Sequence, residues 1–273
     1  MKEKISLAGD LGSGKSTVSE ILIRRLGAEY YSTGAIVRSI AERYGMTVVE
    51  LNKYMEAHPE IDHEIDDGLR ALSDVDKLLV IDSRMAWHFT SGTFKVYLST
   101  DIETSAFRIM NANRAGEHAL TLAETIADTR ARRESEKKRY FTQYGVEIKD
   151  LMNYSLIVDT TNATPDEVAE CIISSFNSWC DDKSFRMAYI SPERLHFPDD
   201  AADQELVSSL SAKLEAGEAV PEITAFENDG EFYLDDGIES ALAYSFNMST
   251  FIPVKLVRGS IDGRKYVQMK NSL

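Results

Sequence analysis

The sequence is poor in cysteine and has no long apolar run, and each shortage excludes a class of protein. Cys171 and Cys180 are the only 2 cysteines among 273 residues, and they lie nine positions apart in one segment of helical character. That spacing suits neither a disulfide nor a metal site, so we expect two reduced thiols. Because no run of about 18 apolar residues occurs and the stretch MKEKISLAGD lacks the apolar segment of a signal peptide, we expect a cytoplasmic protein without a membrane span.

Positive charge is also scarce. The chain has 30 Lys and Arg against 45 Asp and Glu, which gives a formal net charge of −15. Nucleic-acid backbones are bound by surfaces rich in Lys and Arg, so this composition predicts no nucleic-acid partner. A small anionic substrate is compatible with it, provided that basic residues converge locally. The hydrophobic fraction of 43% predicts a packed core.

Short apolar segments alternate with longer segments of helical periodicity over the first 180 residues. The strand-like segments are KISLA, EYYS, KLLVID, FKVYL and YSLIVD. This rhythm predicts an α/β fold, a parallel sheet flanked by helices. The last helix of this region is expected after Thr164, which forms a capping box with Glu167 and is followed by Pro165.

A different order of segments follows the polar stretch WCDDKS, which suits a linker. FRMAYI reads as a strand, DQELVSSLSAKLEAG as a helix closed by Gly217, and EITAFENDGEFYLD as a hairpin with an Asp-Gly turn. GIESALAYSFNM then predicts a helix and FIPVKLV a strand. Residues 181–273 are therefore expected to form a separate small α+β domain.

The stretch GDLGSGKST matches the phosphate-binding pattern G-x-x-x-x-G-K-[ST], with a strand before it and a helix after it. Backbone N–H groups of the loop and the positive end of the helix would hold the β-phosphate of ATP. Lys15 would bridge the β- and γ-phosphates, and Ser16 would bind Mg²⁺. The expected ATP-binding loop comprises Gly9, Asp10, Leu11, Gly12, Ser13, Gly14, Lys15, Ser16 and Thr17.

Asp10 stands at a variable position of this pattern, and its charge is the opposite of what an anion site needs. We therefore expect its side chain to point outward, away from the phosphates. On this view, Asp10→Pro would leave the ATP affinity within about tenfold, or roughly 1.4 kcal/mol.

Residues for a second substrate follow the next two strands. Ser32 and Thr33 can cap a helix that carries Arg38, and a guanidinium beside a helix N-terminus suits an acceptor phosphate. Asp82 ends the strand KLLVID at the ligand edge of the sheet, where a carboxylate can hold a water molecule on Mg²⁺. Arg84 is expected to reach the same crevice.

The segment DTRARRESEKKRYFTQYG places Arg132 and Arg139 seven residues apart, about two helical turns, so both are expected on one helix face. A run of charges alone is typical of a solvated face. Beside a phosphate-binding loop it indicates a segment that closes over the substrates, stabilises the transferring phosphoryl group and excludes water.

These stretches, together with ELNKYMEAHPEID and YSLIVDTTNATPDEV, resemble the nucleoside monophosphate kinases of the P-loop superfamily, specifically the short archaeal-type cytidylate kinases. The resemblance spans residues 3–176. It implies a three-layer α/β/α domain with a five-stranded parallel sheet over residues 1–180, an acceptor-binding insertion at 34–73 and a lid at 111–144.

The resemblance also implies roles for single residues. Ser32, Arg38 and Arg84 would bind the acceptor, Arg108 would flank the adenine, and Ser16 and Asp82 would hold the metal. The expected catalytic residues are Lys15, Asp82, Arg132 and Arg139. This chain departs from the family at Asp10, where proline is usual, at Ser83-Arg84, where Gly-Arg is usual, and at Met85, where many bacterial members have an acidic residue that reads the base.

The C-terminal segment resembles the ParB/sulfiredoxin-like domain more weakly, through ISPERL and the stretch that runs from VPEITAF to FIPVKLV. That family typically carries D-G-H-x-R, whereas this chain has Asp236, Gly237, Ile238, Glu239 and Ser240. The clustered acidic groups would repel phosphate. We therefore predict a degenerate module with a binding, regulatory or oligomerising role.

Three hypotheses follow from the sequence. The first is an ATP- and Mg²⁺-dependent kinase that acts on CMP or dCMP. The second is a kinase for another small metabolite, with the acceptor selected by the C-terminal region. The third is a non-catalytic protein in which ATP binding closes the lid and reorients the C-terminal region towards a partner.

Overall fold

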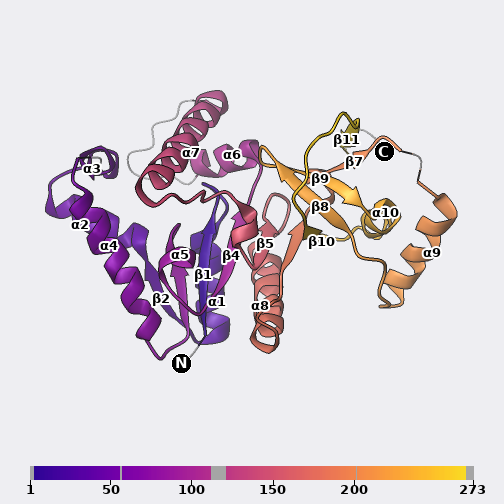
Figure 1. Cartoon of the computed structure of the whole chain (residues 1–273), viewed down its shortest axis with the longest axis horizontal. Coiled ribbons are helices and arrows are strands. Elements are labelled where there is room, and N and C mark those ends of the chain that lie inside the picture. The colour runs from indigo at the N-terminus through magenta and orange to yellow at the C-terminus, as the bar shows by residue number, and fades with distance from the viewer. Residues whose placement is uncertain (1–2, 56, 112–120, 201, 269–273) are drawn as a thin grey trace.

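The computed structural model describes residues 3–55, 57–111, 121–200 and 202–268 (Figure 1). Its described strands form one sheet in the order β11-β7-β9-β8-β10-β6-β5-β4-β1-β3-β2. The five strands of the N-terminal region are β1 (Lys4–Gly9), β2 (Glu29–Ser32), β3 (Leu79–Asp82), β4 (Thr93–Ser99) and β5 (Leu156–Asp159). Each pairs in parallel with its neighbours, so the predicted five-stranded parallel sheet is confirmed.

Helices cover both faces of this sheet because successive strand side chains point to opposite sides. Ile5 and Leu7 of β1 pack against α1 (Lys15–Leu26) and α8 (Pro165–Asp181), whereas Ala8 belongs to the cluster on the other face. There, α4 (Pro59–Ala71) and the short α5 (Ala86–Phe89) cover β3. The predicted capping box of α8 is confirmed, since Thr164 and Glu167 accept each other's backbone N–H groups.

The region predicted to bind the acceptor is helical. It comprises α2 (Thr33–Arg43), α3 (Val48–Met55), α4 and the 3₁₀ turn η1 (Leu72–Asp74). The three α-helices share a small core around Ile40, Leu51 and Ile65. The predicted lid contains the last residue of α6 (Ile102–Asn111) and all of α7 (Leu122–Tyr144). Residues 112–120 of that lid lie outside the described residues.

The C-terminal region contains β6 (Met187–Ile190), η3 (Pro192–Arg194), β7 (Leu195–Pro198), α9 (Gln204–Glu215), β8 (Thr224–Asn228), β9 (Glu231–Asp236), α10 (Ile238–Phe246), β10 (Ile252–Leu256) and β11 (Tyr266–Gln268). The expected helices and hairpin are present. The strands β7 and β11 were not expected, because they are only 4 and 3 residues long and β7 ends in proline. None of the described helices has the length and apolar character needed to cross a membrane.

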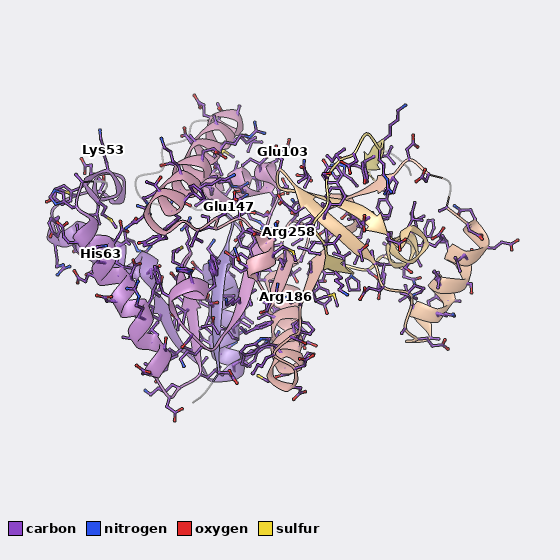
Figure 2. All side chains as sticks on the ribbon, in the orientation of Figure 1. Lys53, His63, Glu103, Glu147, Arg186 and Arg258 are labelled. Atoms are coloured by element: carbon purple, nitrogen blue, oxygen red, sulfur yellow. The ribbon has the colours of Figure 1, made fainter. Side chains whose placement is uncertain are left out.

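The C-terminal strands continue the N-terminal sheet, as Figure 1 shows to the side of β5. β6 pairs in parallel with β5, with Leu156 opposite Met187, and one apolar cluster joins Tyr97 and Ile157 to Phe232. Arg258, labelled in Figure 2, adds an ion pair with Asp150 at 3.0 Å across this junction. The stretch WCDDKS, expected as a linker between domains, is therefore the end of α8 and its short connection to the next strand of the same sheet. The alternation of apolar and polar residues in FRMAYI predicted the strand β6, but it could not predict that β6 pairs with β5.

Candidate active site

The loop of residues 9–17 joins β1 to α1 at the carboxyl edge of the sheet, as the pattern predicts. Two glycines allow its close packing. A Cβ on Gly9 would lie 2.4 Å from the carbonyl oxygen of Leu98, and one on Gly12 would lie 2.6 Å from that of Ser105. Both have positive φ angles, 149° and 72°, which side chains with a Cβ rarely adopt. The loop backbone can therefore pack tightly against the backbone of β4 and α6.

Lys15 lies inside the crevice. Its Nζ donates hydrogen bonds to the carbonyl oxygens of Gly9 (3.0 Å) and Asp10 (2.7 Å). Burial and the nearby charge of Arg84 lower the pKa of Lys15 to about 8, against the opposing effect of Asp82. Three residues predicted from separate stretches of sequence, Lys15, Asp82 and Arg84, thus act on one another electrostatically.

Asp10 contradicts its sequence prediction. The side chain does not point outward: the residue is 6% exposed, and its carboxylate accepts hydrogen bonds from the Tyr97 hydroxyl and the Thr100 N–H, both at 3.1 Å. Lys149 lies 3.1 Å and Arg133 3.7 Å from the same carboxylate. Burial alone would raise the pKa of Asp10, but the two cations and the Thr100 N–H together outweigh burial and hold the pKa below its ordinary value.

The physical reason for this error is that the cations that stabilise a buried Asp10 come from distant segments. Arg133 lies on α7, and Lys149 lies in the connection that follows it. Sequence reasoning missed both, although the charge run containing Arg133 was recognised. Arg133 follows Arg132 directly and so points about 100° away from it around the helix.

A small charged cavity of about 30 Å³ lies at this point. Its lining includes Asp10, Arg84, Arg133, Glu136 and Lys149. The helix α7 thus meets the loop of residues 9–17 through groups of both charges.

Glu136 of α7 connects the two arginines predicted to act on the acceptor and on the transferring group. Its carboxylate accepts from Arg84 Nε at 2.7 Å and from Arg132 Nε at 3.3 Å. Burial lowers the pKa of Arg84, but Glu136, Tyr140 and Asp82 together outweigh burial, so the pKa rises. Sequence reasoning did not single out Glu136, and its spacing of four residues from Arg132 was the available signal.

Arg139 lies further along α7. Its guanidinium donates to the Tyr140 hydroxyl at 3.2 Å and stacks 5.0 Å from the centre of that ring. The charge of Asp62, on α4, also stabilises its positive form and helps to raise its pKa against the effect of burial. Arg139 therefore faces the helical insertion.

The residues predicted to bind the acceptor lie where β2 and β3 end and in α2. Ser32 caps α2, because its Oγ accepts the backbone N–H three residues on at 3.3 Å. The Asp82 carboxylate accepts from the Tyr30 hydroxyl at 3.2 Å. Arg38 is exposed, and its Nη1 lies 3.5 Å from the point where a Cβ on Gly34 would stand, so its side chain turns back along the first turn of α2.

The predicted metal ligands provide oxygen donors. Ser16 is exposed at the start of α1, and Asp82 ends β3. Among the described residues no group of three or more His, Cys, Asp or Glu side chains could hold a metal ion. A hydroxyl and one carboxylate fit Mg²⁺, which is held in kinases by few protein groups together with phosphates and water.

A larger pocket of about 340 Å³ opens on the other side of the phosphate loop. Arg108 and Ile109 of α6 line it, together with Gly12, Ser13, Gly14, Thr17, Val18, Thr160, Ala163, Pro165 and Val168. The Arg108 guanidinium donates to the carbonyl oxygens of Thr160 (2.7 Å) and Thr161 (3.3 Å). The volume falls within the range of small-ligand pockets.

Comparison with known proteins extends these observations. The model of the cytidylate kinase-like family matches residues 4–162. A cytidylate kinase from Sulfurisphaera tokodaii is 34% identical over 175 residues, which are 63% of this chain and 94% of that protein. An S-adenosylmethionine-dependent nucleotide dehydratase from Lacinutrix mariniflava is 37% identical over 177 residues, which are 64% of this chain but only 36% of that protein.

Among solved structures, a shikimate kinase from Bacteroides thetaiotaomicron aligns with 66% of this chain and 98% of its own, at 15% identity and a TM-score of 0.45. The ParB/sulfiredoxin-like resemblance of the C-terminal region stays a prediction, as do the domain boundary at residue 180 and self-association through that region.

Proposed function

The chain belongs to the cytidylate kinase-like family, and we propose that it transfers the γ-phosphoryl group of ATP to the phosphate of CMP or dCMP. The observation that carries this proposal is the crevice in which Lys15, Asp82 and Arg84 converge beside the phosphate loop under the lid helix. The cytidylate kinases among the relatives support the choice of acceptor.

The donor would bind along the loop of residues 9–17. The adenine would occupy the pocket of about 340 Å³ beside Arg108, and the loop N–H groups would hold the phosphates. Lys15 would bridge the β- and γ-phosphates in place of the carbonyl oxygens that it contacts now. Ser16 and Asp82 would hold Mg²⁺, which neutralises charge on the phosphates when bound.

The acceptor would bind between α2 and β3. Arg38, next to the N-terminus of α2, and Arg84 would hold its phosphate, with Ser32 beside them. An oxygen of that phosphate attacks the γ-phosphorus in line, the bond from the γ-phosphorus to the bridging oxygen breaks, and ADP leaves. No covalent intermediate with the protein is required.

The lid helix would complete the site. Arg132 and Arg139 supply positive charge to the transferring group, and Glu136 keeps Arg84 and Arg132 within reach of each other. The same carboxylate would have to yield Arg84 to the acceptor phosphate, so acceptor binding and lid position are coupled through one ion pair.

The test is a panel of nucleoside monophosphates, each incubated with purified protein, ATP and Mg²⁺. We expect ADP and a diphosphate to form in equal amounts, fastest with CMP or dCMP. Lys15→Ala should reduce the rate at least a hundredfold, whereas Lys77→Ala, which removes an exposed partner of Glu29, should not change it. If no monophosphate raises ADP formation above the rate without acceptor, the assignment is wrong.

The same experiment separates the other hypotheses. A widened panel of amino acids and sugars would reveal a kinase for another metabolite. Strong ATP binding without turnover on any acceptor, combined with ATP-dependent capture of a defined partner, would support a nucleotide-gated binding protein.

A further inference from the structure

Arg194 of η3 is a buried cation from the C-terminal region that lies against the nucleotide-binding edge of the sheet. It is 4% exposed, and its Nη1 contacts the carboxylate of Asp159 at 3.1 Å and the hydroxyl of Ser99 at 3.3 Å. Its Nη2 donates to the carbonyl oxygen of Gly230, in the β8–β9 hairpin, and Glu231 lies 3.7 Å from its Nε. One guanidinium therefore connects the ends of β4 and β5 to a hairpin more than thirty residues further along the chain.

Asp159 in turn fixes the turn that follows β5. Its carboxylate is 0% exposed and accepts from the N–H (3.1 Å) and the hydroxyl (2.6 Å) of Thr161, and from the N–H of Ser191 at 3.2 Å. The Thr161 hydroxyl also accepts the N–H of Asp101 at 3.2 Å. The position of the Thr160–Thr161 turn thus depends on an ionised carboxylate buried beneath it.

The other side of this turn is a wall of the pocket proposed for the adenine. Thr160 lines that pocket, and Arg108, which also lines it, is bonded to the carbonyl oxygens of Thr160 and Thr161. A chain of direct contacts therefore runs from Arg194 through Asp159 and Thr161 to Arg108. A displacement of Arg194 would therefore shift the wall of the pocket proposed for the adenine.

The need for Arg194 follows from the burial of Asp159. An ionised carboxylate with no exposed surface requires a paired cation, and removing that cation leaves an uncompensated buried charge. Asp159 lies inside the segment matched by the family model, whereas Arg194 lies beyond it. The alignment with the Sulfurisphaera kinase uses 94% of that protein in 175 residues, so that kinase has no segment of comparable length to the C-terminal region here.

We propose that Arg194 is a positioning residue for the adenosine part of ATP, and that the C-terminal region thereby completes the donor site. The inference rests on the proposed function in one respect, namely that the adenine of ATP binds in the pocket of about 340 Å³. It predicts that a change at Arg194 affects binding of the base and leaves binding of the phosphates to the loop of residues 9–17 intact.

The experiment compares ATP with inorganic tripolyphosphate, which can use the phosphate loop but has no base. Both are titrated calorimetrically, with Mg²⁺, into the full chain and into Arg194→Met. We expect the Kd of ATP to rise at least about tenfold and the Kd of tripolyphosphate to change by less than about twofold. Equal weakening of both ligands, or no change in either, would overturn the proposal.

Two further variants keep the test decisive. Arg258→Met removes an exposed arginine of the same region, and both dissociation constants should stay unchanged. Should Arg194→Met fail to fold, the double variant Arg194→Met/Asp159→Asn replaces it, because it removes both buried charges together. We expect the same selective loss of ATP binding in the double variant, since the contact from Arg194 through Asp159 to the Thr160–Thr161 turn is still missing. An unchanged ratio of the two dissociation constants there would refute the proposal.

These titrations need neither an acceptor nor turnover. If ATP binds and no nucleotide is phosphorylated, the proposed reaction fails while the role of Arg194 is still tested. If the reaction occurs and the ratio of the two dissociation constants does not change, only the role of Arg194 fails.

Discussion

Replacing Asp10 by asparagine removes one negative charge from the phosphate loop while keeping the shape of the side chain. In the native protein this carboxylate is 6% exposed, and Lys149 and Arg133 lie 3.1 and 3.7 Å from it. The amide oxygen of asparagine can still accept from Tyr97 or Thr100, but it cannot neutralise two cations. The variant therefore leaves positive charge unpaired beside Lys15, whose pKa is already lowered.

Asp10→Asn should lower the free energy of unfolding by an amount that thermal and urea denaturation can measure. Removing one partner of a buried ion pair costs about 3–5 kcal/mol. The Lys149 side chain is 35% exposed, so water stabilises its unpaired charge in part, and we expect about 2–4 kcal/mol. For a chain of this size the melting temperature should fall by roughly 5–15 °C.

The matched control is Glu29→Gln, which removes the carboxylate of an ion pair with Lys77 whose two side chains are 59% and 60% exposed. That change should cost less than about 1 kcal/mol. A loss in Asp10→Asn no larger than in this control would refute the argument that the buried carboxylate is held by Lys149 and Arg133.

The pH dependence gives an independent check with a defined sign. The pKa of Asp10 lies below its ordinary value of 3.8, so its ionised form is stabilised by folding. Its contribution to stability is complete above that value and is lost as the pH falls through the lower pKa of the folded state. The stability difference between the native protein and Asp10→Asn should therefore be constant from about pH 7 to about pH 5 and should shrink below about pH 4.

The structure also reverses the expectation for Asp10→Pro. Proline would remove the Asp10 N–H, which donates to the carbonyl oxygen of Leu98 at 2.9 Å, and would leave the same two cations unpaired. We now expect ATP affinity to fall by more than tenfold, measured by the same calorimetric titration. Retention of affinity within tenfold would restore the earlier view of this position.

Three further predictions concern the site and its frame. Because the pKa of Lys15 is about 8 in the free protein, kcat/KM for ATP should decline above about pH 8, whereas Lys15→Arg, however slow, should show no such decline in its pH profile. Arg84→Lys should raise the KM of the acceptor at least about tenfold with little change in the KM of ATP, and Arg70→Lys, an exposed partner of Asp67, should change neither. Thr164→Ala removes the cap of α8 and should lower the free energy of unfolding by about 1 kcal/mol in urea denaturation, with turnover unchanged.

Local features of this protein were readable from its sequence. The parallel strands are short apolar segments, and the phosphate loop is a contiguous sequence pattern. Glycine is required at Gly9 and Gly12 because a Cβ there would collide with neighbouring backbone atoms. Ser32 and Thr164 were recognisable as caps because a cap acts on N–H groups within three residues. The residues at the ends of β1, β2 and β3 could be assigned to one crevice because parallel strands end at the same edge.

What the sequence could not determine was the partner of each buried charge. Asp10 was judged by its place in a motif, yet the direction of its side chain depends on Lys149 and Arg133, which only the packing of α7 and its following connection brings near. The spacing of Arg132 and Arg139 was recognised, while the carboxylate that joins Arg132 to Arg84 was not.

The relation between the two halves of the chain was decided in the same way. The alternation in FRMAYI predicted a strand, but only the tertiary structure placed β6 beside β5 and Arg194 beneath Asp159. Periodicity and motifs record interactions between residues close in the chain, and these were enough for the elements and the phosphate loop. Strand neighbours and buried ion pairs join residues far apart in the chain, so they become defined only when the whole chain has packed.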